Sequence, residues 1–513
     1  MVPFPVPSGS YRDLAVVKDG VVWIEVADRG GELGATRAGV TGEAPSDVLW
    51  HYNLSARHLD KLCERVDTFS VSGDGERLVV RHRDDTIVVP SSHKVDGDDP
   101  ACIRVDLTRL RRTVNPRAEW RQMFDENGRL MASHYWREDM NGVDWDSVLN
   151  RYRPLVDLCH VVDDLHDILW ETVAELNTSH SYVSASGAAG DSDMRAGLLG
   201  ADVSSGNDGA KVVRVIPGES SDPRAWSPLR AAGVAVTEGD VIVAVDGRKV
   251  GADGNLGELL EGSAGRVVEL TVRRGENERQ VAVVPMADEA PLRYHDWVAS
   301  RRRYVEEHSG GRLGYLHVPD MVSDGWAELH RQIGEATRHE GVIADVRFNH
   351  GGHTSQLVVE RLARRVVGWD YSRWYATADT YPQNAVRGPI VMVTNQWAGS
   401  DGDIVAAATQ AMGYAKVIGE RSWGGVVGID GRFDLVDGTS VTQPRYAGWY
   451  GSYGWGVENH GVDPDIVVTV SPEDWEADCD VQLDAAIAEC LRQLDDKPAA
   501  TAPELPGPAF DRC

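Results

Sequence analysis

The spacing of hydrophobic and polar positions changes several times along the chain, and each change predicts a different kind of structure. Residues 1–106 alternate short apolar runs such as LAVVKDGVVWIEV with Asp-Gly turns, a pattern typical of β-hairpins or propeller blades. Residues 107–187 carry apolar residues every three or four positions, as in VDDLHDILWETVAELN, which predicts helices. Since the first region has too few strands to close a propeller, we expect further blades to precede it.

The second half of the chain predicts two more units. Residues 195–288 are again rich in strand patterns, and they follow a stretch, SASGAAGDSDMRAG, whose composition indicates a linker. Residues 289–497 alternate apolar strand segments such as GVIADVRF and PIVMVTN with helical patterns, which is typical of an α/β layer. The helical patterns lie near residues 323–338, 355–367 and 403–412. Residues 498–513, rich in Pro and Ala, predict an extended tail without a catalytic role.

Length and charge limit the possible functions. A chain of 513 residues exceeds one hydrophobic core and predicts several domains. Its net charge of −28 opposes binding to phosphate backbones, so we expect no nucleic-acid partner. The start, MVPFPVPSGSYRDL, lacks the pattern of a signal peptide, and we expect a cytoplasmic protein that binds no membrane. The six cysteines show no paired spacing, which favours reduced thiols.

A strand-to-helix corner holds the most informative residues. The stretch PIVMVTNQWAGSDGDIVAAATQAMG predicts a buried strand ending at Asn395, a turn of small residues around Ser400, and a helix from about Asp403. A serine at such a corner exposes its hydroxyl, and the unpaired N–H groups that begin the helix suit an oxyanion. Ser400 is therefore a candidate nucleophile. The alternative is an ordinary helix N-cap.

Motifs around this corner resemble a known protease superfamily. The stretch TEGDVIVAVDGRKV resembles the signature of PDZ domains, and together with IADVRFNHGG and the Ser400 corner it resembles the tail-specific and tricorn serine proteases. In the tail-specific branch a lysine follows the serine within a GxxTFGKG-like stretch. Here that stretch reads GERSWGG, with Gly425 in the lysine position, and the nearby Lys416 precedes it. A Ser-Lys mechanism therefore has no evident base.

The tricorn branch is similar to this chain at each of its catalytic motifs, over nearly the whole length. The AGSDGDI, NTSH and ENxGVDPD blocks of that branch are matched by Ala398–Ile404, Asn177–His180 and Glu458–Asp465. The resemblance implies that Ser400 is the nucleophile and His180 the general base, with Ser179 and Glu458 as a relay that orients the imidazole. Taken singly, these three residues could be a surface histidine, a helix terminus and a loop carboxylate.

The residue types of this proposed catalytic set are suited to serine catalysis, independently of the family resemblance. A histidine with an unperturbed pKa near ~6.5 can take and return a proton at neutral pH, which a serine nucleophile requires. His180 and Ser400 are 220 positions apart, on opposite sides of the PDZ-like unit. The helical domain must therefore fold back onto the α/β domain.

The resemblance also indicates groups that would bind substrate. The N–H of Asp401 is one expected oxyanion donor, and the second is expected from the glycine loop, with Gly352 favoured over Gly351. His350 stands where we would expect a glycine, which leaves the second donor open. Asp370 is the candidate for an aspartate in the specificity pocket, where it would favour cleavage after Lys or Arg. It could equally be an acidic residue of a surface loop.

We therefore predict a multidomain α/β and β protein. It comprises a partial β-propeller at 1–106, a helical domain with the catalytic histidine at 107–187, a PDZ-like domain at 195–288 and an α/β sandwich with the nucleophile at 289–497. The predicted function is that of a serine endopeptidase for short peptides or unfolded polypeptide, downstream of the proteasome or another primary protease. The resemblance implies a homo-oligomer, a hexamer, that passes products to aminopeptidases.

Two alternative functions remain. One is a tail-specific Ser-Lys protease, and the other is a non-catalytic scaffold that binds peptides through its PDZ-like domain. Acyl transfer requires only nucleophile, base and oxyanion donors, so we expect no cofactor. The histidines at 350, 353 and 460 lack a matching carboxylate, so we expect no metal.

Overall fold

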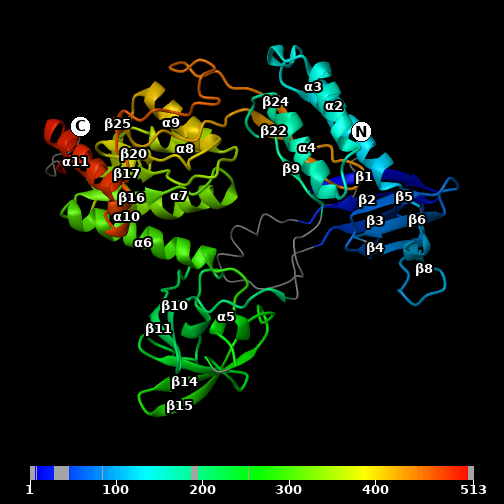
Figure 1. Ribbon diagram of the computed structural model, residues 1–513, viewed down its shortest axis with the longest axis horizontal. Helices are drawn as coiled ribbons and strands as arrows, with labels where there is room; N and C mark the ends of the chain where they lie inside the picture. Colours follow the sequence, from blue (N-terminus) through cyan, green and yellow to red (C-terminus); the bar gives the residue numbers. More distant parts are fainter. Residues whose placement is uncertain are drawn as a thin grey trace, which may run out of the picture. The chain divides into compact units, whose positions relative to one another are not determined.

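The computed structural model divides into two compact units (Figure 1). One comprises residues 1–114 with 220–223, and the other comprises 115–219 with 224–513. The described residues are 6, 9–27, 46–83, 85–111, 113–186, 194–251 and 253–505. Half of the predicted linker, residues 187–193, and the second half of the predicted tail, including Cys513, lie outside the described residues.

The first unit consists of two antiparallel four-stranded sheets. The strands of one are β1 (Tyr11–Val17), β2 (Gly20–Glu25), β3 (Val48–Asn53) and β4 (His58–Glu64). Those of the other are β5 (Thr68–Val71), β6 (Arg77–His82), β7 (Asp85–Pro90) and β8 (Ile103–Arg104). Side chains from both sheets, including Ile24, Leu49 and Leu78, form one hydrophobic core. Each sheet has the strand order of a propeller blade, and the propeller itself stays a prediction.

The second unit begins with three amphipathic helices: α2 (Pro116–His134), α3 (Trp145–Val156) and α4 (Val162–Ala174). Asn115 and Asp144 cap the first two, because their side chains accept hydrogen bonds from the first-turn N–H groups. The apolar faces form a core that also includes Leu435 and Val441, from much later in the chain. Short strands continue this link, since β9 (Val183–Ser184) pairs with β23 (Ser440–Val441).

Residues 201–283 form an antiparallel sheet in the order β10-β11-β12-β14-β15, with β13 beside β12. The bounds are β10 (Ala201–Gly206), β11 (Gly209–Val215), β12 (Val241–Val245), β13 (Arg248–Lys249), β14 (Val268–Arg274) and β15 (Asn277–Val283). Two short helices, η4 (Pro228–Arg230) and α5 (Leu256–Leu259), belong to the same region, and Leu229, Leu256 and Leu259 enter its core. The Gly239-Asp240 pair directly precedes β12, where Asp240 accepts hydrogen bonds from Arg274.

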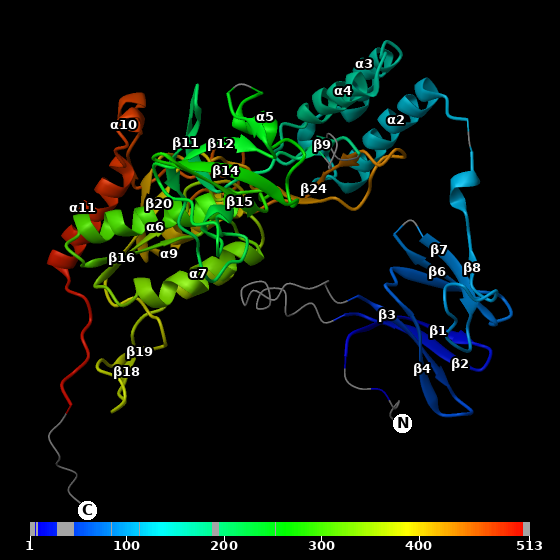
Figure 2. The same cartoon turned by 90° about the horizontal axis from the view of Figure 1, so that it is seen from below.

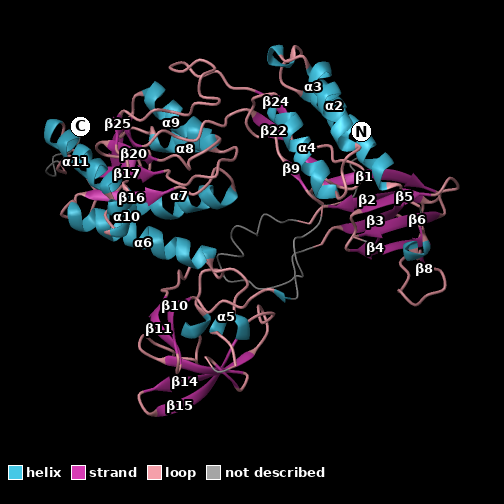
Figure 3. Ribbon diagram, viewed as in Figure 1, coloured by secondary structure: helices cyan, strands magenta, loops and turns pink. Residues whose placement is uncertain are grey.

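The rest of the chain is built on a five-stranded parallel sheet in the order β16-β17-β20-β21-β25. The strands are β16 (Leu313–His317), β17 (Gly341–Asp345), β20 (Ile390–Thr394), β21 (Ala415–Gly419) and β25 (Ile466–Val467). One face packs against α7 (Ser323–Ala336), α8 (Ser355–Leu362) and α9 (Asp401–Met412), and the other against α6 (Ala290–His308) and α11 (Val481–Asp496) (Figure 3). All residues of β16, β17 and β20 are buried, as expected for strands covered on both faces.

Two helix boundaries differ from those that the pattern predicts. The helix expected near 355–367 ends at Leu362, because Arg365 already forms a β-bridge with Val386. The helix expected from about Asp403 begins at Asp401.

Two small antiparallel strand pairs project from the layers. They are β18 (Gly368–Asp370) with β19 (Asp379–Tyr381), and β22 (Gly428–Asp430) with β24 (Gln443–Tyr446). None of the described helices combines the length and apolar character that a membrane span requires.

Candidate active site

Ser400 occupies the corner between β20 and α9, with an unusual backbone conformation. Its φ is 57° and its ψ is −120°, a left-handed φ that is uncommon for a residue with a side chain. Ser400 stands at the N-cap position, but its side chain makes no capping hydrogen bond. An ordinary N-cap serine would accept a hydrogen bond from the first turn of its helix. The Ser400 hydroxyl is therefore not used to cap α9.

His180, Ser179 and Glu458 form a continuous chain of hydrogen bonds. The Ser179 hydroxyl donates to Glu458 Oε2 at 3.0 Å and lies 3.0 Å from His180 Nδ1. The Ser179 backbone N–H also donates to Glu458, at 2.7 Å from Oε1. Since a hydroxyl has one proton, Ser179 accepts its second hydrogen bond from Nδ1–H of His180. The proton on Nδ1 leaves Nε2 as the unprotonated nitrogen of the ring.

Several backbone contacts bring these distant segments together. Glu458 Oε2 accepts the N–H groups of Val426 and Val427, at 2.8 and 3.0 Å. The Thr442 hydroxyl donates to the carbonyl of His180, at 2.5 Å, and accepts the N–H of Tyr182, at 2.7 Å. The amide of Asn459 donates to the carbonyl of Asn177, at 2.7 Å. The helical region thus folds back onto the α/β region, as the predicted site requires.

The imidazole of His180 lies among aromatic rings. Its centroid is 5.7 Å from that of Tyr182 and 5.4 Å from that of Trp423, both nearly perpendicular to it. Burial lowers the pKa of His180 below its usual value, and the negative charge of Glu458 opposes this shift without reversing it. The histidine is therefore neutral near pH 7, as a general base must be.

Trp423 lies between His180 and the corner that holds Ser400. A Cβ on Gly399 would lie 2.7 Å from the Trp423 ring, so the indole packs directly against the residue before Ser400. Both Ser400 and His180 are described, and no hydrogen bond joins the serine hydroxyl to the imidazole. In unliganded enzymes such catalytic hydrogen bonds are often long and shorten only when substrate binds. His180 and Gly399, the residue before Ser400, thus border the same indole ring.

The glycine loop after β17 lies against Ser400. A Cβ on Gly351 would lie 2.5 Å from Cβ of Ser400, which explains why a residue without a side chain stands there. The N–H of Gly351 donates to Oδ1 of Asn349, at 2.9 Å, whereas no acceptor is present for the N–H of Gly352 or Asp401 among the described residues. Of the two glycines, Gly352 therefore keeps an N–H that could bind an oxyanion.

Sequence reasoning missed two buried residues that shape this corner. Asn349 accepts the N–H of Gly399 with its backbone carbonyl and the N–H of Gly351 with its side chain. Asp403 accepts hydrogen bonds from the Ser422 hydroxyl and from the N–H groups of Gly424 and Gly425. An acidic residue three positions after an N-cap serine is the pattern of a capping box, and this signal could have identified Asp403.

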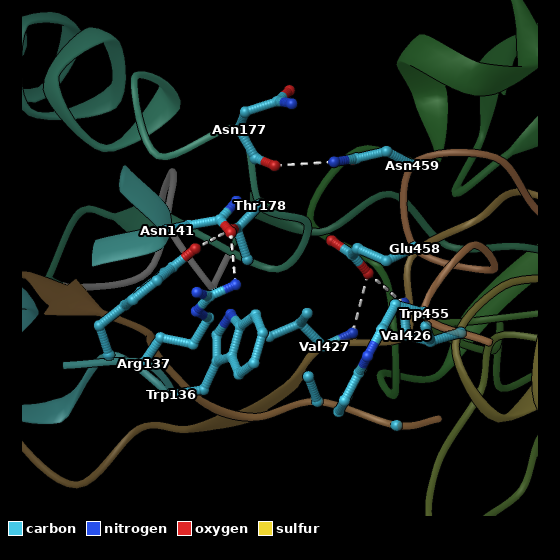
Figure 4. Close-up of a pocket in the computed structure, with 13 residues that line it drawn as sticks. Trp136, Arg137, Asn141, Asn177, Thr178, Val426, Val427, Trp455, Glu458 and Asn459 are labelled. Atoms are coloured by element: carbon cyan, nitrogen blue, oxygen red, sulfur yellow. Dashed lines mark hydrogen bonds between the residues drawn. The ribbon is translucent and has the colours of Figure 1, made fainter. Parts of the chain in front are cut away.

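A pocket of about 440 Å³ borders Glu458 (Figure 4). The indoles of Trp136 and Trp455 are stacked in its wall, with centroids 5.8 Å apart, and the guanidinium of Arg137 lies over Trp136. Glu458 and Asn459 border the same space, which lies between the helical and α/β regions. The Glu458 carboxylate thus borders a pocket whose lining residues do not include Ser400.

The last predicted site residue, Asp370, and the residues of the alternative sites are exposed. Asp370 is exposed at the end of β18, in a hairpin that projects from the α/β layers (Figure 2), and none of the described site residues contacts it. Lys416 is exposed and pairs with Asp465, with Nζ 3.3 Å from Oδ1. His350 and His353 are exposed. No group of three or more His, Cys, Asp or Glu side chains in the described part of the chain could hold a metal ion.

Comparison with known proteins decides the family. Three family models match the chain: the Tricorn protease C1 domain at residues 116–174, the Tricorn protease PDZ domain at 197–288 and Peptidase family S41 at 312–468. The crystal structure of the tricorn protease superposes with a TM-score of 0.87, at 33% identity, over 96% of this chain and 47% of that one. The chain belongs to the tricorn protease family. The predicted family and the mixed α/β and β fold class are thus confirmed.

Curated relatives agree over nearly the whole chain. Tricorn protease homolog 1 of Streptomyces coelicolor is 55% identical over 511 residues, which are 99% of this chain and 48% of the relative. The tricorn protease of Thermoplasma acidophilum is 34% identical over 493 residues, which are 96% of this chain and 45% of the relative. The chain thus spans about half the length of the curated relatives it matches. These matches support the predicted serine protease class.

Proposed function

We propose that this chain is a serine endopeptidase in which Ser400 attacks the peptide carbonyl and His180 acts as the general base. The observation that carries the proposal is the hydrogen-bond chain from Glu458 through Ser179 to Nδ1 of His180. This chain holds the tautomer whose Nε2 can accept a proton. The lowered pKa of His180 keeps that nitrogen available at neutral pH.

Each residue has a defined step in the reaction. As the Ser400 oxygen bonds to the carbonyl carbon, His180 takes the hydroxyl proton, and Glu458 and Ser179 stabilise the imidazolium. The carbonyl oxygen, now negative, accepts hydrogen bonds from the N–H groups of Asp401 and Gly352. His180 then passes its proton to the leaving amine as the C–N bond breaks. Water, activated by the same histidine, hydrolyses the acyl-enzyme.

The glycine loop and the nucleophile corner support this assignment of the oxyanion donors. Gly351 approaches Ser400 closely, while its own N–H is engaged by Asn349. The N–H groups of Gly352 and Asp401 remain for the substrate. We include Gly351 as the residue whose missing side chain leaves room for the carbonyl.

The substrates, partners and location of the protein are part of the same proposal. We propose short peptides or unfolded polypeptide as substrates, delivered by the proteasome or another primary protease, with products passed to aminopeptidases. We also propose a homo-oligomer, a hexamer, in the cytoplasm. Asp370 stays a candidate for a preference for Lys or Arg before the cleaved bond, which the ratio of cleavage after Arg to cleavage after Leu would test in Asp370→Asn.

The decisive experiment labels and removes the nucleophile. We expect a fluorophosphonate probe to attach to Ser400, located by mass spectrometry, and Ser400→Ala to abolish cleavage of fluorogenic peptides in a folded protein. We expect His180→Ala to lose cleavage by orders of magnitude. Lys416→Ala is the matched control for the Ser-Lys alternative, and it should retain activity because its ammonium is paired with Asp465 at the surface. Turnover by Ser400→Ala, or loss in Lys416→Ala alone, would contradict the proposal.

A further inference from the structure

The nucleophile and the His-Ser-Glu relay are carried by different parts of the chain. Ser400 belongs to the corner between β20 and α9, whereas His180 and Ser179 follow the helical region. No hydrogen bond joins the Ser400 hydroxyl to His180, although both residues are described. Their separation must therefore be maintained by other contacts, which Asp403 and one short segment provide.

Asp403 is fully buried at the third position of α9. The backbone of Ser400 lies close enough to this carboxylate to lower its pKa, against the larger effect of burial. A side chain at this position that reaches back to the N-cap N–H is half of a capping box. The Ser400 hydroxyl does not form the other half, so the Asp403 carboxylate lies beside the left-handed backbone of Ser400 while the hydroxyl caps nothing.

The other contacts of Asp403 come from one segment, residues 422–427, which we call the bridging segment. The Ser422 hydroxyl and the Gly424 N–H donate to Oδ1, at 2.5 and 2.8 Å, and the Gly425 N–H donates to Oδ2 at 3.3 Å. The next two N–H groups of the segment, those of Val426 and Val427, donate to Glu458. Successive donors of one segment thus bind the carboxylate behind the nucleophile and the carboxylate of the relay.

The bridging segment also contacts the base itself. Trp423, between the residues that bind Asp403, packs edge-on against the ring of His180 and over Gly399. A Cβ on Gly425 would lie 2.2 Å from the same indole, so this position holds a glycine to make room for it. Any shift of the segment relative to α9 would therefore move the indole, the imidazole and Glu458 together.

An ionised carboxylate suits this position better than other side chains. Asp403 accepts hydrogen bonds from three donors, and a carboxylate offers about four lone-pair sites, whereas an amide of the same size would direct two N–H groups at these donors. Burial raises the pKa of Asp403 to about 6, so the group is ionised near pH 7 and becomes protonated in mild acid.

We propose that Asp403 is a positioning residue that holds the nucleophile corner and the His-Ser-Glu relay in register through residues 422–427. This inference rests on the proposed function, because it assigns the carboxylate a role in that reaction. Asp403 does not touch substrate in this role. It acts through Ser400 on one side and through the bridging segment on the other.

The test compares Asp403→Asn with Thr409→Val in the full chain. Thr409 is another fully buried polar residue of α9, bonded to Val405 and Tyr414 and not to the bridging segment. We expect Asp403→Asn to lower kcat by about 100-fold with KM changed less than about twofold, because it disturbs positioning and not substrate binding. We expect Thr409→Val to lower the melting temperature while keeping kcat, and both variants to remain folded at the assay temperature.

A pH profile gives a readout that a purely structural role would not move. In the wild type, protonation of His180 and protonation of Asp403 should each reduce kcat/KM in acid. A plot of log(kcat/KM) against pH should therefore approach a slope of about two on its acid side. Asp403→Asn should reduce that slope to about one. The other titratable groups nearest to Asp403 are Tyr450, which burial keeps protonated, and Asp401, and both are present in either protein.

Separate outcomes distinguish this inference from the proposed function. Wild-type kcat and an unchanged acid slope in Asp403→Asn would overturn the inference, while an inactive Ser400→Ala would leave the proposed function intact. Equal losses of kcat in Asp403→Asn and Thr409→Val would also overturn it, because they would indicate a general effect on α9. Turnover by Ser400→Ala would remove the proposed function and with it the premise of the inference.

Discussion

At the scale of single residues, the proposed relay concentrates four hydrogen-bond donors on one carboxylate. Glu458 accepts the hydroxyl and N–H of Ser179 and the N–H groups of Val426 and Val427. Its contribution to the reaction passes through Ser179 to the imidazole. The two residues should therefore act as a unit and not as independent groups.

We accordingly expect non-additive losses in the relay. Ser179→Ala and Glu458→Gln should each lower kcat less than Ser400→Ala does, because they orient His180 and form no bond to substrate. The double variant should lose less than the product of the two single losses, since both residues act through His180. Single-turnover kinetics on one peptide, for the wild type, the two single variants and the double variant, would measure these losses. Fully multiplicative losses would mean that the residues act independently.

The lowered pKa of His180 gives a second expectation at this scale. The neutral ring is the active base, so the contribution of His180 to the acid limb of kcat/KM should have a pKa below about 6.5, in addition to that of Asp403. The charge of Glu458 raises this pKa, and Glu458→Gln should therefore move the acid limb to lower pH. A pH profile of both proteins would measure this shift. An acid limb that moved to higher pH in Glu458→Gln would contradict the conclusion that the charge of Glu458 raises the pKa of His180.

At the scale of elements, pairing between distant segments positions the base. Strand β9 pairs with β23, and the hydroxyl of Thr442 fastens this pairing to the backbone of His180 and Tyr182. We expect Thr442→Val to lower kcat, because an isosteric side chain without the hydroxyl leaves that carbonyl and N–H unpaired. Thr442→Ser keeps the hydroxyl and is the control. Equal kcat in the two variants would exclude a role for this contact in placing His180.

A buried ionic network joins the sheet to the last helix. Arg347, which is 5% exposed, pairs with Asp345 at the end of β17, at 2.7 Å, and with Asp480, the N-cap of α11, at 2.8 Å. Arg347→Met should lower the free energy of unfolding by about 3–5 kcal/mol, because it leaves two buried carboxylates without this partner. Arg421→Met, which breaks an exposed pair with Asp463, is the control and should change it much less. Urea titration measures the free energy of unfolding of both variants. Equal losses would contradict a stabilising role for the buried network.

At the scale of the whole molecule, assembly is the prediction that the family resemblance supplies. We expect a purified sample to sediment as six copies of the 56.1 kDa chain. Analytical ultracentrifugation would measure this, with the diluted sample as a control for weak association. A monomer at all concentrations would contradict the hexamer and leave the chemistry of Ser400 and His180 to be tested separately.

Local patterns in the sequence were sufficient to identify elements and family. Apolar periodicity reports on burial directly, so the strand before Ser400 and the helices around 165 and 330 were predicted close to their actual bounds. Motif blocks identified the family because each keeps its spacing within a few residues. Boundaries were less certain where tertiary pairing intervenes, as at Leu362.

Long-range contacts were decided only by the tertiary structure. No local pattern shows that residues 422–427 share their N–H groups between Asp403 and Glu458, or that Thr442 binds the backbone of His180. The hydrogen bond from the Gly351 N–H to Asn349, two positions earlier, is local, yet it too depends on the folded loop, and Gly352 as oxyanion donor stays a proposal. The sequence alone determined which residues could carry out the chemistry, because side-chain chemistry is local. Their geometry depends on hydrogen bonds between segments far apart in the chain, and only the folded structure defines these.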